Sequence, residues 1–471
     1  MSGPGLPLVE EFPREPDVEE MFCRLAGRPH CLFLDSAVRD PVLGRYSFLS
    51  ADPFGYFEYP VEHGDSLAEL ARRLAPFRTE PIDGLPPFQG GAAGLFSYDL
   101  GRQLEAIPAP VFDEFRVPAL AMGLYDVVLA IDHVDRRAWV ISQGFPETEP
   151  ARRCRRAAAR LAAFSEWLRH PPAAQPAREA RGPMLPASRL APQYAVRGPK
   201  GLTSNFCEAG YLDAVRRAIE YVWAGDVFQV NLAQRLLYPA SEDPVTLYLR
   251  LRSRNPATFA GFFDLGHTAI LSASPERFLR VHAGQVEARP IKGTRRRTAR
   301  PEADLFAAAE LRQSEKDRAE NVMIVDLLRN DLSRVCLPET VQVSQLCQVE
   351  RYAFVQHLVS AVCGRLGPEY GPIDLVRAAF PGGSVTGAPK VRAMEIIAEL
   401  EPTARGPYCG SLGYVGFDGA MDLNILIRTI TAAGGWWQAP VGGGIVAQSD
   451  PRSEYEETWH KAEGLLRAFS P

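Results

Sequence analysis

One stretch of the sequence, residues 272–334, sets the tightest limits on what this chain can form. Apolar runs at 268–272 and 280–282 predict two strands at its start. Residues 322–328 are apolar on nearly every side, which predicts a buried helix. Glu320 stands just before that run, and a carboxylate is costly to bury unless it is paired or binds a cation. The stretch therefore predicts a functional site within a mixed α and β unit.

A second acidic group bears on the role of Glu320. Taken alone, Glu320 has an ordinary explanation, a salt bridge to Arg318 or Lys316. Near the C-terminus, however, Glu454 and Glu457 lie on one face if residues 453–461 form a helix. Carboxylates from two helices beside an anionic substrate describe a Mg²⁺ site, because Mg²⁺ prefers oxygen ligands. A solvated acidic helix end remains the alternative for residue 456.

Two glycine-rich segments predict anion sites. Glycines 442–444 precede the C-terminal helix and can point backbone N–H groups at an anion. Residues 380–390 place glycines and hydroxyls just before another helical pattern. This second segment is not a P-loop, because Ala388 follows Gly387 where that motif requires lysine.

Lysine is scarce in this chain, and arginine supplies nearly all of the basic charge. Arginine cannot be deprotonated in a protein and so cannot act as a nucleophile. Each remaining lysine is thus a candidate for a specific role, although a biased genome composition would produce the same scarcity. The lysines are Lys200, Lys292, Lys316, Lys390 and Lys461.

The overall composition favours a small-molecule partner. The formal net charge is -5 and the isoelectric point is near 6.0, which disfavours binding to nucleic acid or to an anionic membrane. The eight cysteines are scattered with no Cys-x-x-Cys pair, so we expect reduced thiols in a cytoplasm. No apolar run approaches the length of a membrane span, and no secretory signal pattern is apparent.

The chain divides into three predicted parts. Residues 1–150 are rich in strand patterns, including a hairpin over 125–142. Within them, residues 90–98 are small, as expected where backbones approach closely; a phosphate-binding loop is the less favoured interpretation. Residues 151–205 predict an amphipathic helix followed by a linker rich in proline, alanine and arginine. Residues 206–468 alternate helical and strand patterns.

Five motifs, in this order, resemble the signatures of the chorismate-utilising enzymes, and the first half resembles the N-terminal domain of the large subunits of anthranilate synthase and aminodeoxychorismate synthase. The resemblance implies an α+β fold of two packed, mainly antiparallel sheets surrounded by helices. It also implies chorismate as substrate and Mg²⁺ as cofactor. The motifs occupy residues 272–278, 317–321, 381–390, 442–446 and 454–458.

The resemblance also implies roles for individual residues. Glu320 and Glu457 would bind Mg²⁺, with Glu454 close by. Glu276 would be the general acid that protonates the departing hydroxyl, which needs a carboxyl kept protonated by its surroundings. His357 would lie near the substrate ring; a histidine satisfied within the core is the alternative. The implied substrate-binding residues are Gly293, Thr294, Thr386, Tyr408, Arg428, Gly442, Gly443 and Gly444.

Two positions separate the branches of the family. Isochorismate and salicylate synthases carry a lysine that activates water where this chain has Gln229, and glutamine has no basic lone pair. Anthranilate synthases typically have an apolar residue at the position of Lys292, whereas aminodeoxychorismate synthases have lysine. Amination at C4 is explained if a lysine amine first attacks C2 and is then displaced by ammonia attacking C4. We therefore expect 4-amino-4-deoxychorismate as the product, on the route to 4-aminobenzoate and folate.

Two other functions stay open. The chain could be an anthranilate synthase component, or a non-catalytic chorismate-binding subunit. No glutaminase segment is recognisable in the sequence, so the resemblance implies that a separate glutaminase subunit supplies ammonia. Ser36, Thr258 and Phe259 occupy places where relatives bind tryptophan, although Asp35 departs from the glutamate common in inhibited anthranilate synthases.

Overall fold

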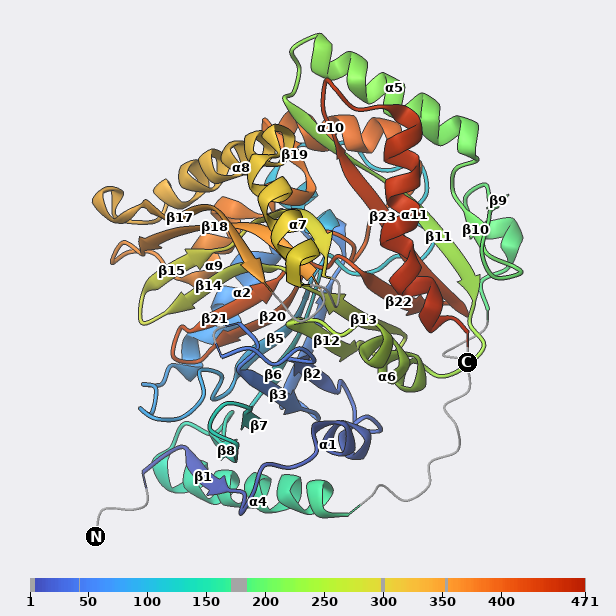
Figure 1. The fold of residues 1–471 in the computed structure, drawn as a ribbon. Helices are drawn as coiled ribbons and strands as arrows, with labels where there is room; N and C mark the ends of the chain where they lie inside the picture. Colours follow the sequence, from blue (N-terminus) through green and yellow to red (C-terminus); the bar gives the residue numbers. More distant parts are fainter. Residues whose placement is uncertain (1–4, 42, 171–183, 298–300, 352–354, 471) are drawn as a thin grey trace.

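Two large antiparallel sheets form the centre of the molecule, with helices on their outer faces (Figure 1). The computed structural model describes residues 5–41, 43–170, 184–297, 301–351 and 355–470. The expected α+β fold of two packed sheets surrounded by helices is confirmed.

The first sheet contains 13 strands among the described residues. In spatial order these are β1 (Leu8–Glu11), β8 (Arg137–Ser142), β7 (Val127–Asp132), β3 (Tyr46–Ser50), β2 (Leu32–Asp35), β12 (Phe259–Asp264), β13 (Thr268–Ser274), β22 (Thr429–Ala433), β23 (Trp436–Ile445), β11 (Gln229–Pro239), β10 (Thr203–Ser204) and β9 (Tyr194–Ala195), with β19 (Gly387–Ala388) paired to β11.

The second sheet contains ten strands among the described residues. In spatial order these are β16 (Ile291–Arg296), β18 (Val355–Arg365), β15 (Gln285–Ala288), β14 (Arg277–His282), β21 (Met421–Asn424), β20 (Ser411–Gly416), β5 (Gly91–Phe96), β6 (Leu120–Tyr125) and β4 (Gly55–Tyr59), with β17 (Gln342–Arg351) paired to β18.

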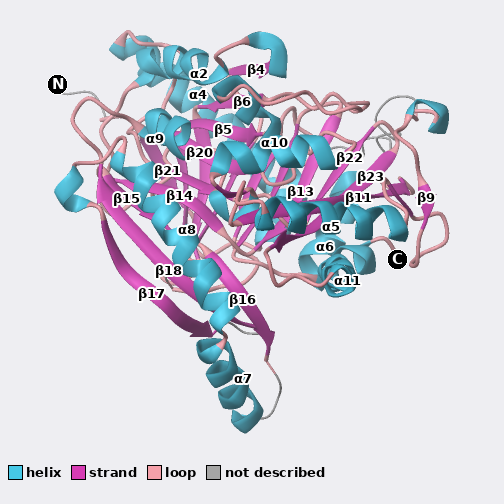
Figure 2. Cartoon of the chain, turned by 90° about the horizontal axis from the view of Figure 1, so that it is seen from above, coloured by secondary structure: helices cyan, strands magenta, loops and turns pink. Residues whose placement is uncertain are grey.

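The helices cover the sheets from outside. Figure 2 shows α8 lying along the long strands β16, β17 and β18, with α7 at their end. Helices α5, α10 and α11 pack on the part of the first sheet that holds β11 and β23. The helix bounds are α1 (Val18–Leu25), α2 (Ser66–Leu74), α3 (Gly101–Leu104), α4 (Pro150–Arg169), α5 (Glu208–Trp223), α6 (Pro244–Arg254), α7 (Pro301–Gln313), α8 (Glu315–Ser333), α9 (Pro372–Ala379), α10 (Lys390–Leu400) and α11 (Pro451–Ala468).

Both sheets combine strands from the two ends of the chain. β2 pairs with β12 in the first sheet, and β5 pairs with β20 in the second. The second pairing accounts for one of the small residues at 90–98, because a Cβ on Gly91 would stand 2.3 Å from the carbonyl oxygen of Val415 on β20. A Cβ on Gly94 would stand 2.1 Å from the carbonyl oxygen of Ala121 on β6, the strand on the other side of β5. Glycine is therefore required at both positions. The predicted boundary near residue 150 stays a prediction about sequence organisation, while the sheets run across it.

The helix predicted around residues 322–328 forms within α8, but it is not buried on every side. Ile324, Val325 and Leu328 are buried, whereas Val322 is 39% exposed. The periodicity of α8 leaves one apolar edge at the surface because β17 and β18 cover only one of its faces. The side of α8 that meets the sheet positions Glu320.

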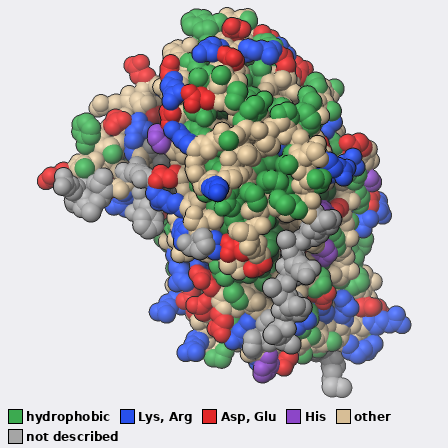
Figure 3. Space-filling model, turned by 90° about the vertical axis from the view of Figure 1, so that its right-hand side faces the viewer, with side chains coloured by type: hydrophobic (Ala, Val, Ile, Leu, Met, Phe, Trp, Pro, Cys, Tyr) green, Lys and Arg blue, Asp and Glu red, His purple; other side chains and the backbone are tan. Residues whose placement is uncertain are grey.

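The surface carries both signs of charge. On the face shown in Figure 3, basic and acidic side chains are interspersed around apolar patches. Such mixing is typical of a protein that does not bind a polyanion. Among the described helices, none combines the length and the apolar character that crossing a membrane would demand.

Candidate active site

Most of the predicted residues converge on one cavity of about 460 Å³, which is lined by strands of both sheets and by two helices. Its walls come from α8, α11, β11, β16, β18, β23 and the turn over residues 383–385. The predicted site residues that line it are Glu276, Lys292, Gly293, Glu320, His357, Tyr408, Arg428, Gly442, Gly444 and Glu457.

Glu276 lies in the turn between β13 and β14, where it is 5% exposed. Ser384 donates a hydrogen bond from its Oγ to Oε1 of Glu276 over 2.9 Å. Burial raises the pKa of Glu276 from 4.5 to about 7, although the Ser384 hydrogen bond and the charge of Lys292 act in the opposite direction. A substantial fraction of this carboxyl therefore keeps its proton at neutral pH, as a general acid must.

Lys292 projects from β16 into the same cavity. Its Nζ donates to the carbonyl oxygen of Ser384 at 3.3 Å and lies 3.8 Å from Oε2 of Glu320. Ser384, whose carbonyl accepts from Lys292, also donates a hydrogen bond from its hydroxyl to Glu276. The amine therefore lies between Glu276, the predicted general acid, and Glu320, a predicted metal ligand. Lys292 is mostly shielded, with 12% of its side chain exposed.

A break in the β16–β18 register turns the backbone next to Lys292. The register shifts between Lys292 and Thr294, and Gly293 there has a φ of +68°. A Cβ on Gly293 would stand 2.9 Å from Cγ of Asp317 on α8. Only glycine both adopts this conformation readily and leaves room for α8. Thr294 pairs with His357 in the register, and its side chain lies outside the described part of the structure.

His357 is buried on β18, facing the cavity. Burial and the positive charge of Arg428 lower the pKa of His357 from 6.5 to about 4. The imidazole is therefore neutral at physiological pH, so it can donate or accept a hydrogen bond without adding charge to the site.

The other predicted substrate contacts fall into two groups. Tyr408 is buried on the cavity wall, and Arg428, with a φ of +51°, lies on the same wall. Gly443 faces α11 instead, and the hydroxyl of Thr386 donates to the carbonyl oxygen of Gly382 at 3.0 Å, behind the wall. The structure thus places Arg428 and Tyr408 where a substrate carboxylate could bind, while Thr386 supports the backbone behind them.

Lysines neutralise the three predicted metal-binding carboxylates. Lys292 faces Glu320, Lys316 Nζ lies 3.5 Å from Oε1 of Glu454, and Lys461 Nζ lies 2.7 Å from Oε1 of Glu457. Three of the five lysines in the sequence therefore meet the carboxylates at this one site.

The electrostatics follow from these pairs. Burial raises the pKa of Glu320, with Lys292 and Lys316 opposing it. Burial acts on Glu457 in the same direction, but Lys461, Lys316 and Lys292 together outweigh it and lower the pKa of that carboxyl. Although burial disfavours the charged form of Lys316, the combined attraction of Glu454, Glu320 and Glu457 raises its pKa. The three carboxylates therefore stabilise a positive charge placed among them, here that of Lys316.

The residues present suit Mg²⁺. Oε2 of Glu454 is buried with no hydrogen-bond partner among the described atoms. A Cβ on Gly443 would stand 3.3 Å from that oxygen and 3.4 Å from Oε1 of Glu457, so the two carboxylates converge over bare backbone. No group of three or more acidic, histidine or cysteine side chains in the described ranges defines a metal position alone. Substrate or water oxygens would complete the coordination of Mg²⁺, as is usual for this ion.

Several cavity residues were not predicted. Ser384 fell inside a recognised motif and Lys316 stands just before another, so the motifs could have signalled them, but their partners become visible only in the structure. Asn231 and His460 also line the cavity. Asn231 follows Gln229 by two residues, and the alternation of a strand could have placed both on one face.

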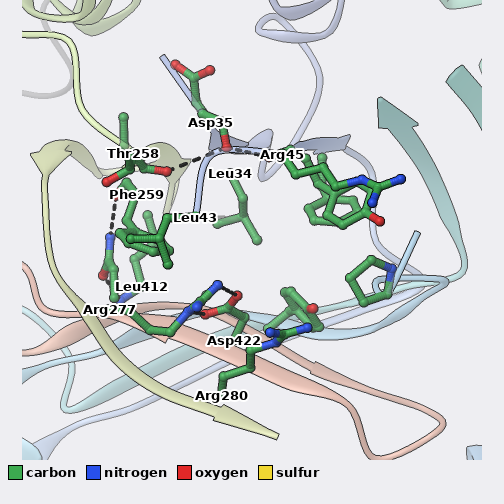
Figure 4. Close-up of a pocket in the computed structure, with 18 residues that line it drawn as sticks. Leu34, Asp35, Leu43, Arg45, Thr258, Phe259, Arg277, Arg280, Leu412 and Asp422 are labelled. Carbon is green, nitrogen blue, oxygen red and sulfur yellow. Dashed lines mark hydrogen bonds and ion pairs between the residues drawn. The ribbon is translucent and has the colours of Figure 1, made fainter. Parts of the chain in front are cut away.

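A second cavity, of about 90 Å³, contains the residues of the predicted tryptophan pocket (Figure 4). Ser36, Thr258 and Phe259 line it between the two sheets, and Arg277 stacks over the Phe259 ring at 4.9 Å. Asp35 points away from the centre of this cavity in Figure 4, because its carboxylate pairs with Arg252 at 2.7 Å.

Comparison with known proteins shows the family to which the chain belongs. A model of the chorismate binding enzyme family matches residues 48–467, and the chain belongs to that family. Among its relatives is the aminodeoxychorismate synthase component 1 of Klebsiella aerogenes, 39% identical over 478 residues that cover 98% of each chain. The anthranilate synthase component 1 of Thermus thermophilus is 43% identical over 411 residues, covering 87% of this chain and 83% of that one.

A solved structure is similar over most of the chain. The crystal structure of anthranilate synthase component I from Streptococcus pneumoniae superposes with a TM-score of 0.75, at 30% identity, covering 91% of this chain and 94% of that one. The relatives thus include both aminating branches of the family, and the choice between them depends on the site.

Proposed function

We propose that this chain aminates chorismate at C4 in the cytoplasm, producing 4-amino-4-deoxychorismate for 4-aminobenzoate and folate synthesis. One observation carries the choice of branch: Lys292 presents a primary amine inside the cavity, 3.8 Å from Glu320 and beside the Ser384–Glu276 pair. The relatives named aminodeoxychorismate synthase component 1 match 98% of the chain at 39% identity, which supports the same branch.

The arrangement allows a two-step displacement. The Nζ lone pair of Lys292 attacks C2, the ring double bonds shift, and the C4–O bond breaks while Glu276 donates its proton, so that water leaves. Ammonia then attacks C4, the double bonds shift back, and the C2–N bond to Lys292 breaks. The excess proton on the new C4 amine passes to the Lys292 amine or to the Glu276 carboxylate. Overall, chorismate and ammonia give the product and water.

Binding and orientation fall to the remaining residues of the cavity. Arg428 presents a guanidinium suited to two-point binding of the pyruvyl carboxylate, and Tyr408 stands on the same wall. Glu320, Glu454 and Glu457 would hold Mg²⁺, which when bound supplies positive charge for the ring carboxylate. Neutral His357 adds a hydrogen-bonding group without repelling Arg428.

Ammonia would come from a glutaminase partner. The name component 1 of the relatives implies a second component. We therefore expect the isolated chain to turn over chorismate with ammonium but not with glutamine as nitrogen source.

The test is product identification with purified chain, chorismate, Mg²⁺ and ammonium, by mass and by addition of aminodeoxychorismate lyase. A product that the lyase converts to 4-aminobenzoate supports C4 amination; anthranilate would support the alternative branch, and no turnover a binding subunit. Lys292→Ala should lower C4 amination roughly 10³-fold or more, the scale of losing a covalent nucleophile. The exposed Lys200→Ala is the matched control and should keep the activity. Retention of C4 amination by Lys292→Ala would contradict the mechanism.

For the second cavity we propose tryptophan as the ligand. Support comes from the Phe259 ring and the Arg277 guanidinium that stacks on it, which together provide an aromatic and cationic wall. Calorimetric titration with tryptophan tests this, with Phe259→Ala as the variant that should lose the heat signal.

A further inference from the structure

Asn231 is a cavity residue to which no role in the displacement has been given. It stands on β11 and is 8% exposed, and its side-chain Oδ1 has no hydrogen-bond partner among the described residues. Its backbone is held on both sides: the N–H donates to Thr386 O at 2.7 Å, and the carbonyl accepts from Nη2 of Arg405 at 2.9 Å. The side chain is therefore presented from a rigid position.

A second oxygen of the same kind lies next to it. In the part of the chain that the structure describes, Oε1 of Gln229 is also buried without a hydrogen-bond partner. Gln229 is two residues from Asn231, so both side chains point to the same face of β11. The Gln229 amide packs directly on the backbone of Gly444, where a side chain would not fit: a Cβ on Gly444 would stand 2.0 Å from Nε2 of Gln229. Two buried acceptors thus lie on one face of β11, and of the two residues Asn231 lines the cavity.

Buried acceptors without donors are rare, because each one loses its hydrogen bond to water on folding. The charged side chains of this cavity do not meet the need of Asn231: Lys292 and Lys461 donate to the carbonyl oxygens of Ser384 and Gly442. A chorismate dianion brings mainly further acceptors. Ammonia, in contrast, is small and carries three N–H donors.

We propose that Asn231, with Gln229 beside it, binds the ammonia that attacks the substrate. This inference rests on the proposed function, in which ammonia is the second substrate. By accepting an N–H bond, the Asn231 oxygen orients the nitrogen and leaves its lone pair free to attack, while Gln229 lies behind it on the same face of β11. The nitrogen becomes positively charged as its bond to carbon forms, so the hydrogen bond to Asn231 strengthens in the transition state.

The test is steady-state kinetics of the full chain with ammonium chloride and chorismate varied separately. Asn231→Val removes the acceptor at similar volume and should lower kcat/KM for ammonia roughly 10- to 100-fold, the cost of one hydrogen bond to a charging group. The KM for chorismate should stay within about threefold. Asn231→Asp keeps an acceptor in the same place and should retain most of the ammonia kcat/KM.

Asn255→Ala is the matched control. Asn255 also has a buried amide atom without a partner, its Nδ2, but it lies at the end of α6 and does not line the cavity. This variant should leave both KM values unchanged.

Three results would overturn the inference. A rise in the chorismate KM of Asn231→Val with the ammonia KM unchanged would assign Asn231 to chorismate. An equal fall in kcat/KM for ammonia and for chorismate, together with a lower Tm, would show that Asn231 has a structural role. A wild-type kcat/KM for ammonia in Asn231→Val would show that Asn231 does not bind ammonia. If the wild-type product were anthranilate, the proposed function would be wrong, but the ammonia kinetics of Asn231→Val would still test this inference. If the wild-type chain formed no aminated product, both would be wrong.

Discussion

The hydrogen bond from Ser384 to Glu276 controls the pH range in which this site can act as an acid. Because kcat/KM for chorismate requires protonated Glu276, it should fall tenfold per pH unit above the Glu276 pKa of about 7. Ser384 donates to Glu276 at 2.9 Å and so stabilises the carboxylate. In Ser384→Ala the carboxylate loses a bond worth roughly 1.5–3 kcal/mol, equivalent to roughly one to two pKa units. The basic limb of the pH profile, where kcat/KM falls as Glu276 loses its proton, should therefore shift to higher pH by that amount.

The assay is kcat/KM for chorismate at saturating ammonia, measured between pH 6 and pH 9 for wild type and variant. Ser411→Ala is the control, because its buried hydroxyl has no hydrogen-bond partner among the described residues and it does not line the cavity. Its limb should remain at the wild-type position. A Ser384→Ala limb that stays near pH 7, or moves to lower pH, would refute the assignment of the limb to Glu276.

Three further predictions concern stability and the metal. The folded-state pKa of Glu276, about 7, lies above its ordinary value of 4.5, so its stabilising contribution is complete below pH 4.5 and is lost as the pH rises through 7. Glu276→Gln should therefore gain on the order of 3 kcal/mol over wild type in denaturant unfolding on going from pH 4.5 to pH 8; a pH-independent difference would contradict this. Arg405→Met should cost about 3–5 kcal/mol, because it leaves the buried Glu401 unpaired and frees the carbonyls of Val385 and Asn231; a melting curve like that of wild type would contradict it. Chelation should stop turnover until Mg²⁺ is added back, and Glu320→Gln should raise the half-saturating Mg²⁺ concentration roughly 10-fold or more; turnover unaffected by chelation would exclude the metal site.

Much of the candidate site was predictable because its chemistry lies in short local motifs. Glu276, Glu320 and Glu457 each stand within a few residues of glycine, proline or apolar patterns that predict a turn or a helix start. Their side chains do line one cavity. By contrast, the prediction that residues 322–328 are buried on every side was wrong, because Val322 is exposed. An apolar run shows that a helix can be buried, but it does not show how many of its faces the sheet covers.

The partners of these residues were not predictable. Lys461 meets Glu457 one helical turn away, a spacing that the sequence displays, but Lys316 meets Glu454 across 138 residues. The bond from Ser384 to Glu276 spans 108 residues. Such contacts depend on how α8, α11 and the turn at 383–385 are placed by the sheets.

The sequence alone determined the family motifs, the scarcity of lysine that marks Lys292, and the regular elements that carry them, because each follows from local periodicity and residue chemistry. Only the tertiary structure decided that strands from both ends of the chain share each sheet and that Glu276 is buried enough to hold a proton near pH 7. It also decided that Asn231 lines the cavity with an Oδ1 that has no hydrogen-bond partner among the described residues. Strand pairing and burial depend on contacts between residues far apart in the sequence, so they arise only when the whole chain folds.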